Sequence, residues 1–302
     1  MSLPFLVWLL LSGIWGSTWL FIKLGLEDLP PITFAGLRFV LASIPLGILL
    51  FVRLKLKRVT LPTAARDWLL MAATGFATFT INYGLVFWGE NHIPSGLTAI
   101  LYTTFPLFGF LMAHFLVRGE PLTVPRLGGV LLGLAGVILI FYRQIQFEGM
   151  MALWGSAAIV LAALQTAYVN VVIKLRAGHL DPTLLTTTQM VCGFIPLLLV
   201  GIPLEGNPFS FAWTPLAWVS LFYLAWVGSA LPFVLLYWLM QRMQVTSTML
   251  ISLSSTLIAV LLGWLVRGEE FGWHTLLGGM AILSGLMLTT VKRRRLAKRW
   301  TS

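Results

Sequence analysis

The chain has 302 residues, of which 58% are hydrophobic and 10% are charged. Soluble domains carry about 25% charged residues, so this composition, with its mean hydropathy of +0.91, excludes an ordinary soluble domain. The net charge of +10 does not indicate nucleic-acid binding, because the basic residues lie in connectors without a folded platform of stacking aromatic side chains.

Apolar segments fill almost the whole chain, and each is close to the ~20 residues that cross ~30 Å of hydrocarbon as a helix. We therefore predict an all-α integral membrane protein with ten transmembrane helices. The predicted spans are residues 3–25, 32–52, 67–89, 94–117, 122–142, 150–173, 183–203, 213–240, 245–266 and 271–291.

The second half of the chain repeats the first with a shift of about 150 residues. The segment Leu116–Glu120 recurs as Leu265–Glu269, and Trp68 recurs as Trp218. An odd number of spans in each half inverts the second copy in the membrane, which is the organisation of many secondary transporters. We predict a first five-helix repeat over residues 1–148, a second and inverted repeat over 149–291, and a basic tail over 292–302.

The basic residues predict the orientation. They gather in the second connector and in the tail, and positively charged connectors face the cytoplasm. Both termini are therefore expected in the cytoplasm. The basic residues of the second connector are Arg53, Lys55, Lys57, Arg58 and Arg66. The few that we expect in connectors on the opposite face are Lys23, Arg38, Arg143 and Arg267.

Acidic residues are absent from the middle of every predicted span, since all ten lie in connectors or near span ends. This distribution argues against a proton relay, a cation channel and a metal-dependent intramembrane enzyme. No Gly-Lys-Ser/Thr phosphate loop is present, so ATP hydrolysis is not expected. The lone Cys192 cannot form an intramolecular disulfide. We expect no catalytic residue, no metal and no cofactor.

Polar and aromatic residues at mid-depth mark the predicted substrate site. Each of them either contacts a ligand or joins helices by hydrogen bonds, since both uses are common for such residues in membranes. Together they describe a cavity with aromatic walls and no fixed charge, which suits a small zwitterion better than a phosphate compound. The predicted substrate-binding residues are Trp15, Asn82, Tyr83, Tyr102, Gln165, Tyr168 and Ser252.

Prolines and glycines predict local geometry. Pro45 and Pro196 lie at matched depth in the second and seventh spans and are either hinges or static kinks, while Pro106 and Pro232 break the fourth and eighth spans. The Gly-rich fifth and tenth spans permit close helix contact, within one chain or across a homodimer. The turns at 118–120 and 267–269 are either simple interfacial turns or anchors that pair with neighbouring helices.

Taken together, the chain resembles the EamA-type drug/metabolite transporters. The resemblance rests on the Trp15–Trp19 segment, the acidic turns at Gly119–Pro121 and Gly268–Glu270, the Gly-rich fifth spans and the ten-span repeat. Within that superfamily the chain is most similar to the bacterial YddG-type aromatic amino-acid exporter branch. The resemblance implies export through a central cavity lined by spans 1, 3, 4, 6, 8 and 9.

We therefore expect a multi-pass transporter of the bacterial inner membrane that exports amino acids, aromatic or neutral, or related metabolites by alternating access. The expected partners are a small-molecule substrate and membrane lipid, with the protein a monomer or a homodimer. The main alternative is a broad-specificity drug or toxicant efflux transporter. An intramembrane enzyme and a passive channel are further alternatives, and we expect the protein not to be an enzyme.

Overall fold

The computed structural model describes residues 3–116, 123–144, 149–240, 242 and 245–290. These residues form helices and connecting turns and no strand. The elements are α1 (Leu3–Gly25), α2 (Pro31–Lys55), α3 (Ala65–Gly75), η1 (Phe76–Asn82), α4 (Tyr83–His92), α5 (Ser95–Tyr102), α6 (Phe105–Leu116), α7 (Val124–Arg143), α8 (Met150–Arg176), α9 (Pro182–Glu205), η3 (Pro208–Ser210), α10 (Pro215–Phe222), η4 (Tyr223–Ala230), α11 (Leu231–Met240), α12 (Val245–Arg267) and α13 (Trp273–Thr290).

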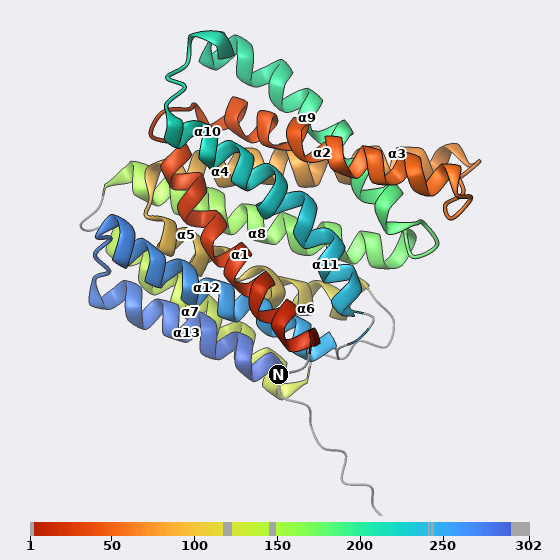
Figure 1. The fold of residues 1–302 in the computed structure, drawn as a ribbon. Coiled ribbons are helices and arrows are strands. Elements are labelled where there is room, and N and C mark those ends of the chain that lie inside the picture. Colours follow the sequence, from red (N-terminus) through yellow and green to blue (C-terminus); the bar gives the residue numbers. More distant parts are fainter. Residues whose placement is uncertain (1–2, 117–122, 145–148, 241, 243–244, 291–302) are drawn as a thin grey trace, which may run out of the picture.

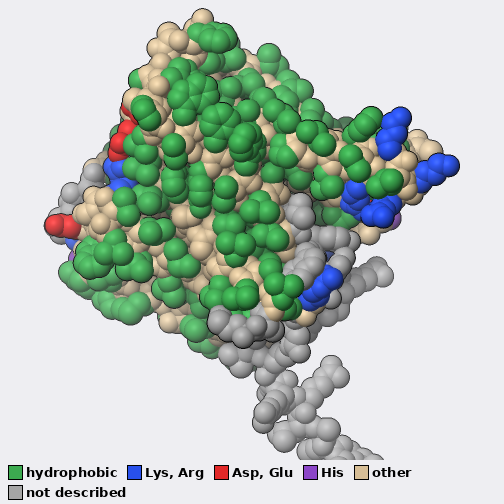
Figure 2. Space-filling model, viewed as in Figure 1, with side chains coloured by type: hydrophobic (Ala, Val, Ile, Leu, Met, Phe, Trp, Pro, Cys, Tyr) green, Lys and Arg blue, Asp and Glu red, His purple; other side chains and the backbone are tan. Residues whose placement is uncertain are grey.

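Seven of the described helical segments are long and apolar enough to cross a membrane, and shorter apolar helices occupy Pro215–Ala230, Ile251–Arg267 and Trp273–Thr289. The seven correspond to the first seven predicted spans, and the three shorter helices lie where the last three were predicted. A belt of exposed apolar side chains covers the helices, with Leu69 71% and Leu199 70% exposed. Figure 2 shows charged side chains near the ends of the bundle and hydrophobic ones between them. A surface of this kind is stable against lipid and unfavourable in water.

The helices pair across the two halves of the chain. The edges of the bundle are formed by α2 with α9 and by α7 with α13, and α1, α8 and α12 lie between them (Figure 1). Helix α1 packs on α12, while α8 packs on α5 and α6. Each half therefore packs its first long helix against the fourth predicted span of the other half.

Glycines allow α7 and α13 to touch through their backbones. A Cβ atom built on Gly278 would lie 2.7 Å from the carbonyl oxygen of Gly136, and Gly129 and Gly285 meet in the same way. Because Gly129 pairs with Gly285 and Gly136 with Gly278, the two helices run antiparallel. The close contact that the Gly-rich spans predicted is therefore made within one chain.

Polar contacts join α2 and α9 at both ends. At one end the Glu205 carboxylate accepts hydrogen bonds from the backbone N–H groups of Ile32 (2.9 Å) and Thr33 (2.7 Å), in the first turn of α2. At the other end Arg53, near the end of α2, lies 3.0 Å from the carboxylate of Asp181, the N-cap of α9. Glu205 accepts hydrogen bonds from backbone N–H groups that the first turn of α2 leaves unbonded, and Asp181 places a negative charge at the N-terminus of α9 while it pairs with Arg53.

The turn that follows α12 also anchors a neighbouring helix. Gly268 adopts a positive φ of 65°, a backbone conformation that Gly accepts at a helix C-terminus. The Glu269 carboxylate then accepts hydrogen bonds from the backbone N–H groups of Ser95 (2.8 Å) and Gly96 (3.0 Å), which begin α5. This turn is thus an anchor as well as a hairpin turn, whereas its counterpart at 118–120 and the predicted basic tail lie outside the described residues.

Two predicted spans contain π-helical segments, η1 in the third and η4 in the eighth. In η4 the Ser229 hydroxyl donates to the carbonyl of Leu224, five residues earlier (2.8 Å). In η1 the Thr80 hydroxyl donates to the carbonyl of Gly193 on α9 (2.7 Å). Single π turns inside α-helices often occur at functional sites.

Candidate functional site

Three polar side chains from three separate predicted spans meet inside the bundle. Asn82 ends η1, Tyr102 ends α5, and Thr166 lies in the middle of α8. The Asn82 amide donates to the Thr166 hydroxyl (2.6 Å) and to the carbonyl of Ala162 (2.7 Å), and the Tyr102 hydroxyl lies 2.9 Å from the Thr166 hydroxyl and 3.3 Å from the Asn82 amide oxygen. We call Asn82, Tyr102 and Thr166 the polar triad.

Irregular backbone positions two members of the polar triad. Pro106 has no N–H to bond the carbonyl of Tyr102 four residues earlier, so α5 ends at Tyr102 and α6 begins at Phe105. The break predicted from Pro106 is thus present. Asn82 is the last residue of the π-helical segment and is 1% exposed. Transporters commonly build their sites where helices are interrupted.

Gln165, the residue before Thr166 in α8, has unused hydrogen-bonding capacity. Its amide nitrogen and oxygen are both buried, and neither has a hydrogen-bond partner among the described residues. Buried side-chain amides are usually bonded, so an unbonded one calls for an explanation. On the opposite side, the ring of Trp19 on α1 lies 5.3 Å from that of Tyr102, centroid to centroid.

Trp15 and Ser252, two other predicted binding residues, have recorded contacts outside the polar triad. Trp15 packs in an apolar cluster with Leu11 and Ile251. Ser252 uses its backbone carbonyl to accept hydrogen bonds from Ser255 and Thr256 within α12.

Tyr83 and Tyr168 complete the predicted set. Tyr83 packs edge-on against Phe39, with ring centroids 4.6 Å apart. Tyr168 is 51% exposed and lines a cavity between α3 and α8. The structure thus unites Asn82 and Tyr102 and places Gln165 next to Thr166. Thr166 itself was not among the predicted residues.

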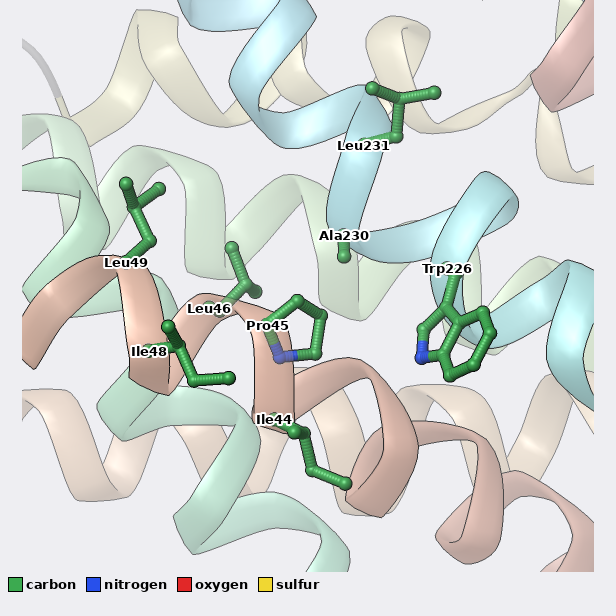
Figure 3. A pocket seen from close by; sticks show the side chains of 8 residues that line it. All are labelled: Ile44, Pro45, Leu46, Ile48, Leu49, Trp226, Ala230 and Leu231. Carbon is green, nitrogen blue, oxygen red and sulfur yellow. The ribbon is translucent and has the colours of Figure 1, made fainter.

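The predicted hinge residues Pro45 and Pro196 lie inside the continuous helices α2 and α9. Pro45 also lines an apolar cavity of about 470 Å³ between α2 and the η4–α11 segment, where Trp226, Ala230 and Leu231 form the facing wall (Figure 3). A second cavity, of about 770 Å³, lies between α3 and α8. The polar triad lines neither of these two cavities, and its side chains are hydrogen-bonded to one another in this conformation.

Arg38 corrects a prediction, because it does not lie in a connector. It is part of α2, is 3% exposed, and donates through Nε to the Ser229 hydroxyl (3.0 Å). Its guanidinium carbon lies 5.2 Å from the centroid of the Tyr83 ring, within the range of a cation–π contact. Arg38 therefore joins α2 to the π-helical segment η4 by a charged hydrogen bond.

Glu90 is a second buried ionisable residue whose burial its sequence position did not reveal. It lies near the end of α4, is 0% exposed, and neither carboxylate oxygen has a hydrogen-bond partner within the described part of the chain. The Lys23 ammonium donates to the backbone carbonyls of Glu90 (2.6 Å) and Ile93 (2.9 Å) and so caps the end of α4. Glu90 thus lies near the end of its span, as predicted, but is fully buried there.

Comparison with known proteins identifies the family. The model of the EamA-like transporter family matches residues 3–142 and again 153–291. The uncharacterized transporter YoaV of Bacillus subtilis is 28% identical over 278 residues, covering 92% of this chain and 93% of its own length. The uncharacterized inner membrane transporter YedA of Escherichia coli K12 is 27% identical, covering 92% of this chain and 87% of its own length. WAT1-related protein At3g02690, chloroplastic, of Arabidopsis thaliana is 27% identical, covering 94% of this chain and 69% of its own.

A solved crystal structure shares the fold, with a TM-score of 0.64 and coverage of 94% of this chain and 95% of that one. At 18% sequence identity this likeness concerns the fold alone. The names of the relatives give no substrate, so the aromatic amino-acid branch stays a prediction. The two family matches together span nearly the whole sequence, and the chain belongs to the EamA-like transporter family.

Proposed function

We propose that this multi-pass membrane protein exports neutral or aromatic amino acids, or closely related metabolites, across the bacterial inner membrane by alternating access. Membership of a transporter family gives the transport role. The observation that carries the substrate class is the uncharged polar triad, and the unbonded amide of Gln165, the residue before Thr166 in α8, adds to it. Amide and hydroxyl groups without fixed charge can bind the ammonium and carboxylate groups of a zwitterion.

Aromatic rings beside the polar triad support the aromatic or neutral side chain. Trp19 and Tyr102 are in contact, and such rings can stack on an aromatic side chain or cover an ammonium group. Because the triad side chains are hydrogen-bonded to one another in this conformation, a bound substrate would have to take over some of these hydrogen bonds. The broken α5–α6 segment and the π segments η1 and η4 are the irregular backbone from which the alternating-access movement could start.

Inverted repeats with ten spans are part of this proposal. The support is the double family match and the packing of corresponding helices, α2 with α9 and α7 with α13. The cytoplasmic location of both termini is supported by the basic residues of the connector between α2 and α3. The proposed binding set keeps Asn82, Tyr102 and Gln165 of the predicted residues and adds Thr166 and Trp19.

The test is counterflow uptake of a labelled aromatic amino acid into proteoliposomes, with a panel of unlabelled competitors. We expect saturable uptake in the wild type and a large loss of uptake in Gln165→Ala. The matched control is Gln189→Ala, since Gln189 is also a buried helix amide but donates to Thr74 away from the polar triad (2.8 Å). Equal uptake by the two variants, at equal amounts of folded protein, would remove Gln165 from the site. No uptake by folded wild-type protein would refute the amino-acid proposal.

Efflux of lipophilic cations is a second candidate, favoured by Glu90. A buried carboxylate can attract a cation, whereas the polar triad carries no fixed charge. Overexpression should then raise cellular tolerance to cationic dyes, and Glu90→Gln should abolish the gain. Unchanged tolerance at verified expression would count against this candidate.

A further inference from the structure

The cavity between α3 and α8 has the shape and chemistry of a lipid site. Its volume is about 770 Å³, which is space for a hydrocarbon chain rather than a single water molecule. Most of the wall is apolar and comes from both helices. The apolar lining residues are Leu69, Leu70, Ala73, Ala77, Val169 and Val172.

Charged residues gather at one end of this cavity. Arg66 and Asp67 lie at the beginning of α3, while Arg176 ends α8 and His179 follows it. This is the end where α2 and α3 meet, and Figure 2 shows Lys and Arg side chains clustered there. The cavity is therefore amphipathic along its length, charged at the mouth and apolar further in.

The depth of the cavity matches one leaflet. From Arg66 at the mouth to Ala77 is eleven residues, which is ~16 Å at 1.5 Å per residue. Half of a hydrocarbon core of ~30 Å is about the same length. An acyl chain that enters beside Arg66 would thus run along α3 to the middle of the bilayer.

The charge at the mouth favours an anion. Asp67 is the acidic residue of the lining, and its side chain is 10% exposed and lies 3.2 Å from Nε2 of His179. The Arg66 side chain, by contrast, is 86% exposed and its Nε is 3.9 Å from the Asp67 carboxylate. Arg176 is exposed as well. Two exposed guanidinium groups at headgroup depth suit a phosphate, to which Arg bonds through paired N–H groups.

We propose that this cavity binds one anionic phospholipid of the leaflet at the basic end of the bundle. The phosphate contacts Arg66 and Arg176, and one acyl chain lies along Ala73, Ala77 and the apolar side of α8. This lipid site is separate from the polar triad, whose residues do not line the cavity, although the predicted binding residue Tyr168 does. Lipid occupancy would hold α3 against α8 and so stabilise the protein.

The test measures lipid retention and thermal unfolding of the full-length purified protein. Phosphatidylglycerol and phosphatidylcholine with identical acyl chains are compared, and inorganic phosphate in lipid-free detergent is a third arm. We expect wild-type protein to retain phosphatidylglycerol in native mass spectra and to unfold at a higher temperature with it than with phosphatidylcholine. Phosphate alone should give no stabilisation.

The double variant Arg66→Gln/Arg176→Gln should weaken phosphatidylglycerol retention about 30-fold, at ~1 kcal/mol for each basic group near the surface. The matched control is Lys57→Gln/Arg58→Gln, which removes the same charge from the exposed connector outside the cavity and should keep the retention. Equal loss in the two double variants would reduce the effect to general surface charge and overturn the proposal.

A second variant keeps the test decisive if the double variant fails to fold. Ala73 is an exposed residue of the cavity wall, so Ala73→Trp fills the apolar part and leaves both arginines in place. We expect it to abolish lipid retention while the protein remains folded. Retention of phosphatidylglycerol by Ala73→Trp, stabilisation by phosphate alone, or a second protein copy in the retained complex in place of lipid would each refute an acyl-chain site.

Discussion

The contact between α7 and α13 yields the sharpest prediction, because it joins two backbones. A methyl group added at Gly278 would lie 2.7 Å from the carbonyl oxygen of Gly136, where ordinary contacts begin at 3.4 Å. A backbone oxygen in a helix cannot rotate away as a side chain can. The Gly278→Ala variant must therefore separate the two helices by roughly 0.7 Å at this point.

The cost of this separation can be bounded. A gap of about 0.5–1 Å forfeits a quarter to a half of the dispersion energy of the atoms involved, and overpacking of a close contact typically costs ~1–3 kcal/mol. We expect the free energy of unfolding of Gly278→Ala to fall by this amount. Adding Gly136→Ala should cost less than a second full penalty, because the first substitution has already moved the helices apart.

Gly128→Ala is the matched control, since Gly128 is exposed in the same pair of helices and an added Cβ would meet nothing within 4 Å. Replacing Gly by Ala in a helix interior should stabilise by about 0.5–1 kcal/mol. The assay is equilibrium unfolding of purified protein in one detergent, followed by far-UV circular dichroism. If Gly278→Ala is as stable as Gly128→Ala, the backbone contact between α7 and α13 is refuted.

Two further substitutions test the carboxylates of Glu269 and Glu90. Glu269→Ala should lower the free energy of unfolding by ~1–3 kcal/mol, because the N–H and hydroxyl of Ser95 and the N–H of Gly96 lose their acceptor. The matched control Glu270→Ala, at an exposed neighbouring residue, should be neutral. Similar melting temperatures for the two variants would contradict the cap on α5. Glu90→Gln should leave the melting temperature unchanged or raise it, because the Glu90 carboxylate accepts no hydrogen bond that the substitution would remove. The assay is thermal melting in detergent followed by circular dichroism. A strong loss of stability would mean that Glu90 has a partner.

Much of the fold is predictable because a long apolar segment is a strong signal, and Pro106 predicted the helix break before α6. The π segments could not be predicted in the same way. Phe79 in η1 packs so closely on Gly193 of α9 that no Cβ fits there, so the wide turn depends on a helix more than 100 residues away in sequence. The amino-acid sequence of η1 alone does not indicate such a contact.

The site was partly predictable for similar reasons. Asn82 and Tyr102 are polar residues at mid-span, and their side chains do meet. Thr166 was missed because a Thr hydroxyl commonly bonds its own helix backbone, so its sequence position does not distinguish it. Glu90 was missed because it lies near a span end, and its burial follows from the close approach of Gly89 on α4 to Gly155 on α8.

The two polar clamps on α2 and α9 restrict how this protein can change shape. Arg53 with Asp181 holds one end, and Glu205 with the first turn of α2 holds the other, so relative sliding of these helices would break charged contacts at both membrane faces. The pair should therefore tilt or translate as one rigid body. In the proposed alternating-access cycle, the change between inward and outward access would then fall to the helices on either side of the polar triad, moving relative to the α2–α9 pair.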